Sequence, residues 1–256
     1  MKEKAFVLAT DLDGTLVGDN TALHTLLSYY EESSLDIAII YITGRHLASS
    51  LSLITEENLP QPDILITDVG TAIYTSLSLT EEALWTEKMQ SDWYPQKIIR
   101  IAENFPLLKR QVLPTDNRIS YTVLQNEEVV REFKQALCEE NIPHKLIFSS
   151  NRDVDILPPN SGKGEALLYV LQNYFHKEVQ VLVAGDSGND VEMLSLGYPS
   201  VIVGNAQQEL IDMTSHPLLY RASKHFAGGI HEAWLHFFNK NSTSANVACN
   251  KETARL

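Results

Sequence analysis

The chain has 256 residues, of which 44% are hydrophobic, and its formal net charge is -13. This length and apolar content allow one large domain, or a core with a sizeable insertion, and exclude a disordered chain. The 33 acidic residues outnumber the 20 basic ones, which disfavours nucleic acid as a partner because a polyanion needs a basic surface.

The cysteines and the apolar runs bear on the cellular compartment. Cys138 and Cys249 are too few for a disulfide framework or a thiolate metal site. The sequence has no apolar run near the roughly 20 residues that span a membrane, and its first apolar run is too short for a signal-peptide core. We therefore expect a cytoplasmic protein with no membrane partner. A monomer or a homodimer is expected.

Apolar segments alternate with helical patterns along much of the chain. Apolar runs predict buried strands at residues 5–10, 36–42, 64–66, 179–184 and 200–203. Helical patterns fill the first two intervals, at residues 19–33 and 45–58. Near-continuous Val, Ile and Leu runs are typical of parallel strands covered on both faces. We therefore predict an α/β fold with a Rossmann-like parallel sheet.

The middle of the chain has a different pattern, which we interpret as an inserted α+β domain. Helices are predicted near 91–104 and 127–140, and strands near 119–124, 144–149 and 153–157. The segment Pro158-Pro159-Asn160-Ser161-Gly162 predicts a linker back to the sheet. The predicted units are a core of residues 1–79 and 161–240, a cap of residues 80–160, and a disordered tail over 241–256.

Two acidic residues follow the first predicted strand directly, in Asp11-Leu12-Asp13-Gly14-Thr15. Alternate residues of a strand share a face, and ligands of a doubly wound sheet bind outside its carboxyl ends, so Asp11 and Asp13 can point into one pocket. Carboxylates that lie close together need a cation to offset their repulsion, and hard oxygen ligands favour Mg²⁺. With the metal bound, one of the carboxylates can attack phosphorus. Asp-x-Asp-Gly also forms ordinary turns, so this segment alone leaves both interpretations open.

Polar residues at other strand ends and helix starts add to this pattern. Thr43-Gly44-Arg45 follows the second strand, where a hydroxyl and free amides can bind an anion or cap a helix. Lys163, between Gly162 and Gly164, can neutralise a phosphoryl oxygen, although exposed lysines at helix starts are common. Gly185-Asp186-Ser187-Gly188-Asn189-Asp190 follows the fourth strand and fits either metal ligation or an Asx turn.

These segments, in this order, resemble the four motifs of the haloacid dehalogenase superfamily, and the insertion resembles the type C2 cap of its Cof-like branch. The resemblance implies that Asp11 is a nucleophile that becomes phosphorylated and that Asp13 is the general acid and base. It implies that Mg²⁺ is bound by Asp11, Asp186 and the backbone carbonyl of Asp13, with Asp190 orienting these ligands. It also implies that the phosphoryl oxygens are bound by Thr43, Gly44, Lys163 and Asn189.

A narrower resemblance is to bacterial sucrose-phosphate phosphatases. It rests on residues 119–121, 148–158, 204–207, 220–223 and 227–230. Phosphatases of related glycosyl products, such as mannosylfructose phosphate, share part of it. The resemblance implies a sugar phosphate as the substrate, with sucrose 6-phosphate as the first expectation. A phosphomutase, which has a similar core and cap, and a binding module that has lost turnover remain alternatives.

The cap is expected to contact the sugar, because a lid covers the leaving group and excludes water. Polar and aromatic side chains suit a sugar, and the candidates are Arg45 from the core and Arg118, Ser120, Tyr121, Ser149, Ser150, Asn151, Arg152 and Asp153 from the cap. Each of these can equally be an ordinary loop or strand residue. Trp85 and Trp93 are interpreted as packing residues near the cap hinge.

Overall fold

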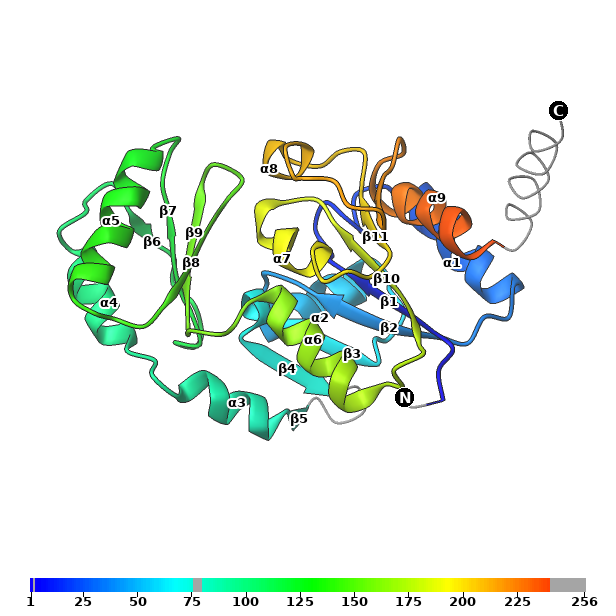
Figure 1. Cartoon of the computed structure of the whole chain (residues 1–256), viewed down its shortest axis with the longest axis horizontal. Coiled ribbons are helices and arrows are strands. Elements are labelled where there is room, and N and C mark those ends of the chain that lie inside the picture. Colours follow the sequence, from blue (N-terminus) through cyan, green and yellow to red (C-terminus); the bar gives the residue numbers. More distant parts are fainter. Residues whose placement is uncertain (2, 76–79, 240–256) are drawn as a thin grey trace, which may run out of the picture.

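The computed structural model describes residues 1, 3–75 and 80–239, so the predicted tail over 241–256 lies outside the described residues. The chain forms a core domain around an eight-stranded sheet and a smaller cap domain around a four-stranded sheet (Figure 1). The predicted class, a parallel α/β core with an inserted α+β cap, is therefore confirmed. Among the described residues, no helix is both long and apolar enough to span a membrane.

The core sheet has the strand order β12-β11-β10-β1-β2-β3-β4-β5. Its strands are β1 (Phe6–Thr10), β2 (Ile37–Ile42), β3 (Ile64–Thr67), β4 (Ala72–Thr75), β5 (Thr80–Glu81), β10 (Gln180–Gly185), β11 (Ser200–Ile202) and β12 (Leu219–Arg221). All pair in parallel except β4 and β5, which are antiparallel additions at one edge. The five predicted strands are present. The sequence analysis missed β4, β5 and β12, which are short strands near the sheet edges.

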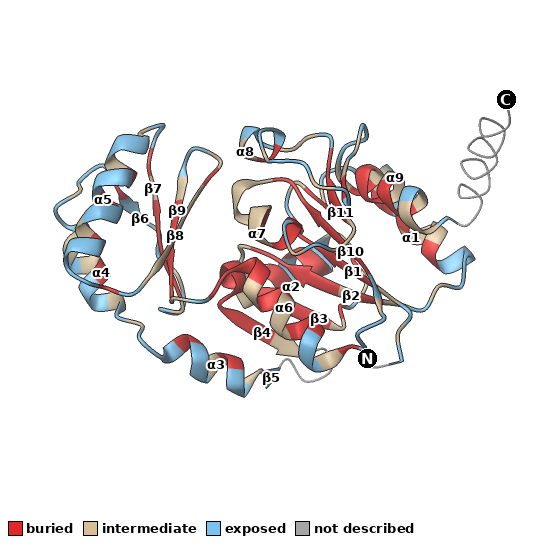
Figure 2. Ribbon diagram, viewed as in Figure 1, coloured by how far each residue is buried: buried red, intermediate tan, exposed pale blue. Residues whose placement is uncertain are grey.

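Strand alternation divides the apolar side chains between the two faces of the core sheet. Leu8 and Leu182 point to one face, which α1 (Asn20–Glu32), α2 (Leu47–Glu56) and α9 (Phe226–Phe238) cover. Ala9 and Val183 point to the other face, which is covered by α3 (Ala83–Gln90), α6 (Lys163–Tyr174), α7 (Val191–Leu194) and α8 (Gln208–Ile211). The strands are accordingly buried between two helical layers (Figure 2).

The cap has one layer of helices on an antiparallel sheet of strand order β6-β7-β9-β8. Its elements are β6 (Lys109–Arg110), β7 (Ile119–Thr122), β8 (Lys145–Ser149), β9 (Asp153–Leu157), α4 (Pro95–Ala102) and α5 (Glu127–Glu139). Ile119, Tyr121, Val154 and Ile156 pack with the helices. The alternate residues Ser120 and Thr122 of β7 and Asp153 and Asp155 of β9 are polar, and Thr122, Asp153 and Asp155 line a cavity between the domains.

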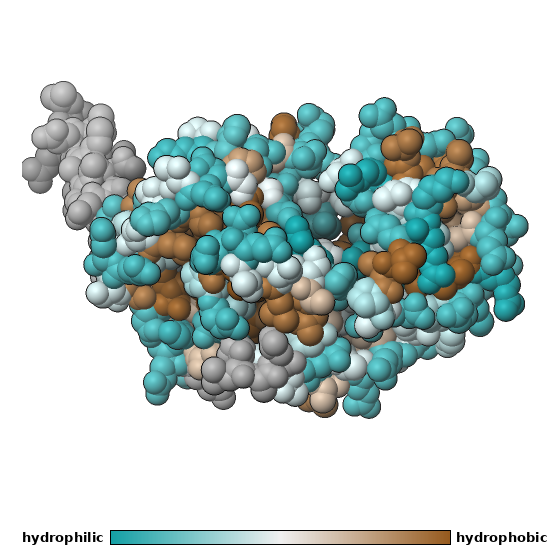
Figure 3. Space-filling view, turned by 180° about the vertical axis from the view of Figure 1, so that it is seen from behind, coloured by the Kyte–Doolittle hydropathy of each residue, from teal (hydrophilic) through white to brown (hydrophobic). Residues whose placement is uncertain are grey.

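The domain limits drawn from the sequence stay a prediction, although residues 80–90 pack with the core sheet. β5 pairs with β4, and the Trp85 indole is buried beside Tyr169 with its Nε1 donating to the Gly70 carbonyl at 3.2 Å. Trp93, in contrast, packs against the buried apolar residues of the cap, which we call the cap cluster, and its Nε1 donates to the Asp116 carbonyl. Both tryptophans are therefore packing residues. The face of the molecule seen in Figure 3 is mostly hydrophilic, with scattered apolar areas.

Candidate active site

Three of the sequence motifs meet at the centre of the core sheet. β1 pairs with β10 on one side and with β2 on the other, all in parallel. Asp11 follows β1, Thr43 follows β2, and Asp186 follows β10. The carboxyl ends of adjacent parallel strands lie at one edge of the sheet, so the topology gathers residues that are far apart in the sequence.

A buried carboxylate cluster lies at this edge. Asp11, Asp186 and Asp190 each offer an oxygen atom within 4.8 Å of the others. Burial and the neighbouring carboxylates raise the pKa of Asp11, and burial and Asp190 raise the pKa of Asp186 to about 6. Carboxylates packed this closely repel one another when ionised, and a hard divalent cation such as Mg²⁺ relieves that repulsion. The donor set therefore fits Mg²⁺.

Lys163 is the cation that the chain itself supplies to this cluster. Its ammonium is 1% exposed and donates to Asp11 Oδ1 and Asp190 Oδ1, both at 2.7 Å. Burial alone would lower the pKa of Lys163, but the carboxylates of Asp11 and Asp190 raise it above its usual value, so the ammonium stays charged. Lys163 is thus a buried ion-pair partner, not an exposed lysine at a helix start.

Hydrogen bonds fix the orientation of the other two carboxylates. Asp190 Oδ2 accepts from the amides of Asp186 and Ser187, each at 3.0 Å, and the Thr15 hydroxyl donates to Asp186 Oδ1 at 2.8 Å. Gly14, at φ +83°, leaves room for this arrangement, because a Cβ there would lie 2.6 Å from Asp186 Oδ2. The segment after β10 therefore forms a capping box between Ser187 and Asp190 in place of the expected Asx turn, and this box includes a carboxylate of the acidic cluster.

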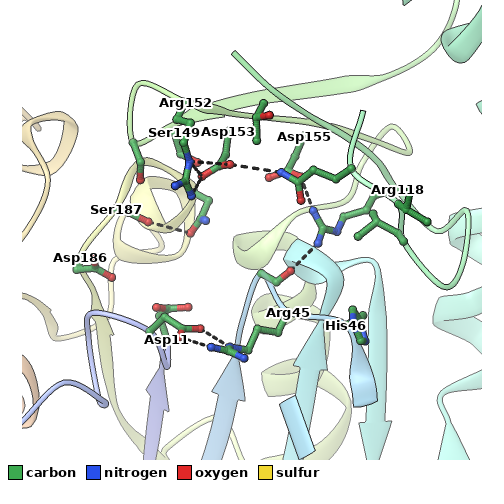
Figure 4. A pocket seen from close by; sticks show the side chains of 18 residues that line it. Asp11, Arg45, His46, Arg118, Ser149, Arg152, Asp153, Asp155, Asp186 and Ser187 are labelled. Atoms are coloured by element: carbon green, nitrogen blue, oxygen red, sulfur yellow. Dashed lines mark hydrogen bonds and ion pairs between the residues drawn. The ribbon is translucent and has the colours of Figure 1, made fainter. Parts of the chain in front are cut away.

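Asp13 lies outside the carboxylate cluster, with its side chain 51% exposed. Arg45 binds it with two parallel hydrogen bonds, from Nε to Asp13 Oδ2 and from Nη2 to Asp13 Oδ1, both at 2.7 Å (Figure 4). The hydrogen bond from Arg45 to Asp13 raises the pKa of the guanidinium. Arg45, expected as a sugar ligand, thus has the Asp13 carboxylate as its main partner here.

Of the residues expected to bind phosphate, Lys163 contacts Asp11 directly. Gly44 and Asn189 line the cavity between the domains. The Thr43 hydroxyl is buried and accepts from the Arg45 amide at 3.1 Å within the loop, whereas the N-cap of α2 is His46, whose side chain accepts from the Ser49 amide. Asn189 Oδ1 is 3.4 Å from the Ser187 hydroxyl, which donates to it. The interpretation of Thr43 as a helix cap is therefore wrong, and anion binding by Thr43 stays a prediction.

The cavity between the two domains has a volume of about 730 Å³. The core lines it with Asp11, Asp13, Gly44, Arg45, His46, Asp186, Ser187 and Asn189. The cap lines it with Gln111, Val112, Leu113, Arg118, Thr122, Ser149, Ser150, Arg152, Asp153 and Asp155. Figure 4 shows cap and core side chains pointing toward one another across this space. Its size is within the range of about 300–1,000 Å³ for small-molecule sites.

The sugar candidates of the cap divide into those at the cavity and those away from it. Those that line it are Arg118, Ser149, Ser150, Arg152 and Asp153. The Ser120 hydroxyl is buried and donates to Asp155. Tyr121 is not brought to the cavity: strand alternation turns its ring toward Phe133 in the cap cluster, with ring centroids 5.9 Å apart. Asn151 is exposed in the β8–β9 turn.

Sequence reasoning missed several residues of this region. Gln111, His46 and Asp155 line the cavity, and Asp68 lies behind it, 3% exposed. Asp155 could have been found from strand alternation, since it is two residues after Asp153. Asp68 could have been found from its position, because it follows β3 just as Asp11 follows β1. Burial raises the pKa of Asp68, and the Arg118 guanidinium acts in the opposite direction.

Comparison with known proteins identifies the family of the chain. The family model of sucrose-6F-phosphate phosphohydrolase matches residues 4–238. Probable sucrose-phosphatase 2 of Arabidopsis thaliana is 34% identical over 250 residues, which are 90% of this chain and 59% of that protein. The chain therefore spans little more than half the length of that relative. Mannosylfructose-phosphate phosphatase of Agrobacterium fabrum is 29% identical over 238 residues, 90% of this chain and 96% of that protein.

A solved structure gives the same result for the fold. The crystal structure of sucrose-phosphatase from Synechocystis sp. PCC6803, in complex with sucrose and phosphate, superposes with a TM-score of 0.84 at 34% identity. The match covers 91% of this chain and 98% of that chain. With its capped fold and its family match in agreement, the chain belongs to the sucrose-6F-phosphate phosphohydrolase family.

Proposed function

We propose that the protein is a magnesium-dependent phosphomonoester hydrolase that acts on a sugar phosphate through a phosphorylated Asp11. The observation that carries this proposal is the position of Asp11. Its carboxylate follows β1, receives a hydrogen bond from Lys163 at 2.7 Å, and lines a cavity that Asp13 and a polar cap face also line. A carboxylate held next to a cation at an open cavity is suited to nucleophilic attack on phosphorus.

The proposed first step uses both aspartates of the first motif. An Asp11 oxygen attacks the phosphorus, so that an oxygen–phosphorus bond forms while the phosphorus–oxygen bond to the sugar breaks. Asp13 transfers its proton to the departing sugar oxygen. In the second step a water molecule attacks the phosphorus and gives a proton to Asp13. The bond between Asp11 and phosphorus then breaks, which releases inorganic phosphate and restores both carboxyl groups.

The surrounding residues position the phosphoryl group and balance its charge. Lys163 neutralises a phosphoryl oxygen, and Thr43, the Gly44 amide and Asn189 donate hydrogen bonds to the others. Asp11, Asp186 and the Asp13 carbonyl are the proposed Mg²⁺ ligands, with Asp190 orienting them. The metal supplies positive charge beside the phosphoryl oxygens when it is bound. Arg45 holds the Asp13 carboxylate at the cavity between the two steps.

Sucrose 6-phosphate is the proposed substrate. The family match, the Arabidopsis relative and the Synechocystis structure with sucrose and phosphate support it. The polar cap face, with Gln111, Thr122 and Asp153, suits the hydroxyl groups of a disaccharide. A second candidate is mannosylfructose phosphate, because the Agrobacterium phosphatase matches this chain over 96% of its own length.

A panel of phosphate esters with Mg²⁺ tests the proposal. We expect phosphate release from sucrose 6-phosphate or mannosylfructose phosphate, and much slower release from glucose 6-phosphate and from a small acid phosphate. Asp11→Asn is expected to abolish release, while Asp36→Asn, at an exposed ion pair with Lys4, serves as the matched control. Good turnover of the small acid phosphate with none of the disaccharide phosphates would overturn the substrate assignment. An isomerised sugar phosphate in place of free phosphate would indicate a phosphomutase.

A further inference from the structure

Arg118 is a buried cation of the cap that contacts the core. Its Nη1 donates to Asp155 and Ser120, both in the cap, and its Nη2 donates to the Gly44 carbonyl of the core at 2.7 Å (Figure 4). The side chain is only 8% exposed. Arg118 therefore joins the cap sheet to the loop whose amide is proposed to bind phosphate.

The remaining nitrogen of Arg118 faces a buried carboxylate of the core. Nε lies 3.5 Å from Asp68 Oδ1, and neither atom has a hydrogen-bond partner among the described residues. The other Asp68 oxygen accepts from the Thr67 hydroxyl at 3.0 Å. Leaving a buried donor and a buried acceptor unpaired is unfavourable, so a small approach of cap to core that joins them would be stabilising.

The turn that carries Asp68 also supports the phosphate loop. The Asp68 amide donates to the Arg45 carbonyl at 2.8 Å, and the Val69 amide donates to the Thr43 carbonyl at 3.1 Å. Asp68 and Val69 both have left-handed backbone angles, at φ +52° and +58°, which non-glycine residues adopt at a cost. The strained turn thus places a carboxylate directly under the loop that Arg118 contacts from above.

We propose that Asp68 is a positioning residue that, through Arg118, holds the cap closed over Gly44. Asp68 does not touch the substrate in this proposal, since it is 3% exposed and is not among the residues that line the cavity. Its carboxylate stabilises the Arg118 guanidinium at the core surface, and Arg118 transmits the cap position to the phosphate loop. The proposal about the cap does not depend on the substrate, whereas its kinetic consequence rests on the proposed function.

Other contacts between cap and core are weaker candidates for this role. Lys145 pairs with Glu192, but the two side chains are 27% and 38% exposed, and ion pairs open to water contribute little. The Ser150 amide donates to Glu209 at 2.6 Å in a partly buried position. Arg118 and Asp68 are the more deeply buried pair across the two domains, so changing either partner has the larger effect, although Arg118 keeps the Asp155 carboxylate when Asp68 is changed.

A distance measurement between the domains tests the proposal without any substrate. Cys138 is exposed on α5 of the cap, and Gln172 is exposed on α6 of the core. A parent with Cys249→Ser and Gln172→Cys carries one spin label on each domain, and pulsed electron resonance reports their distance distribution. Asp68→Asn is well suited to this test, because asparagine tolerates left-handed backbone angles and keeps the size of the side chain while it removes the charge and replaces one acceptor oxygen with an NH2 donor.

We expect the parent to show mainly the short, closed distance. Asp68→Asn and Arg118→Gln should each lower the ratio of closed to open molecules by roughly tenfold. The double variant should lower this ratio no further. Arg131→Gln, which removes an exposed arginine paired with Glu128 on the same domain, should match the parent. A parent-like distribution for Asp68→Asn, or effects of the two variants that simply add, would overturn the proposal.

Kinetics then separate positioning from sugar binding. If Asp68 acts through the cap, Asp68→Asn should raise KM for the disaccharide phosphate by roughly tenfold and change kcat for a small acid phosphate little. Equal losses for both esters would indicate a defect in the phosphate loop and would overturn the role assigned to Asp68. If the protein hydrolyses no glycosyl phosphate at all, the proposed function is refuted. The distance measurement then remains as the test of cap closure.

Discussion

The ammonium of Lys163 lies 2.7 Å from a carboxylate oxygen of Asp11, although 152 residues separate them in the sequence. The whole cap is inserted between these two positions. The contact forms because β1 lies at the centre of the sheet and α6 packs against the same region. A buried carboxylate at this site is therefore compensated by a charge that only the complete core domain can supply.

Lys163→Met should affect both stability and turnover. Removing one partner of a buried ion pair leaves Asp11 and Asp190 uncompensated, which costs about 3–5 kcal/mol of unfolding free energy. Loss of a cation at the phosphoryl group should lower kcat by about 100-fold or more. Urea denaturation and steady-state kinetics measure the two effects, with Lys177→Met, at an exposed position, as the control. Near-parental turnover would refute the role of Lys163.

Arg45→Lys should show that Arg45 acts through Asp13. A lysine cannot reproduce the two parallel hydrogen bonds to the Asp13 carboxylate, so we expect about a tenfold fall in kcat. The fall should be similar for a disaccharide phosphate and for a simple alkyl phosphate, since both leaving groups need a proton. A rise in KM confined to the disaccharide phosphate would instead identify Arg45 as a sugar ligand. Initial-rate measurements on both esters distinguish these outcomes.

The response of stability to Mg²⁺ should depend on pH. Because burial and Asp190 raise the pKa of Asp186 from 3.8 to about 6, the folded state holds this proton more tightly than the unfolded state. Without metal, the contribution of Asp186 to stability is lost as pH rises through about 6. Mg²⁺ replaces the proton, so its effect on Tm should be small near pH ~5 and larger near pH ~8.

Thermal unfolding in EDTA and in millimolar Mg²⁺ checks this expectation. Asp186→Asn removes both the titrating group and a proposed ligand, so its Tm should respond weakly to Mg²⁺ at either pH. An equal rise in Tm at both pH values in the parent would contradict the competition between metal and proton.

Gly70→Ala should be far more destabilising than Gly197→Ala. Both glycines have left-handed angles, at φ +93° and +83°. A Cβ at Gly70 would lie 2.3 Å from the Gly162 carbonyl, next to Lys163, whereas a Cβ at Gly197 meets no described atom within 4 Å. We expect a loss of about 1 kcal/mol at Gly197 from backbone strain, and of about 2–4 kcal/mol at Gly70. Urea denaturation of both variants measures the difference, and equal losses would contradict the packing argument.

The core of the site could be predicted because it depends on strand ends. Apolar runs followed directly by acidic residues mark where Asp11 and Asp186 leave the sheet, and parallel topology brings such ends together. The cap face was less predictable. Alternation within β7 turns Ser120 and Tyr121 to opposite sides, so a polar-looking segment contributes only one of them to the face above the core.

Contacts between the two domains could not be predicted from residue patterns. Arg118 has sugar-binding chemistry, but its Nη1 and Nη2 donate to Asp155, Ser120 and the Gly44 carbonyl in the structure. Asp68 has no motif of its own, and its role emerges only from the position of the turn after β3. Such contacts depend on how the cap is oriented on the core, and the local periodicity of the sequence carries no information about that orientation.

The four-stranded sheet and its two helices come from a single continuous stretch, between Pro95 and Leu157, while every carboxylate of the buried cluster comes from outside it. The residues proposed for the chemistry of the buried cluster and the cap proposed to contact the sugar are therefore encoded in separable blocks of the gene. Grafting the corresponding block of another capped relative onto this core would be a route to new hydrolases, provided that the graft keeps an arginine able to reach the carbonyl of Gly44.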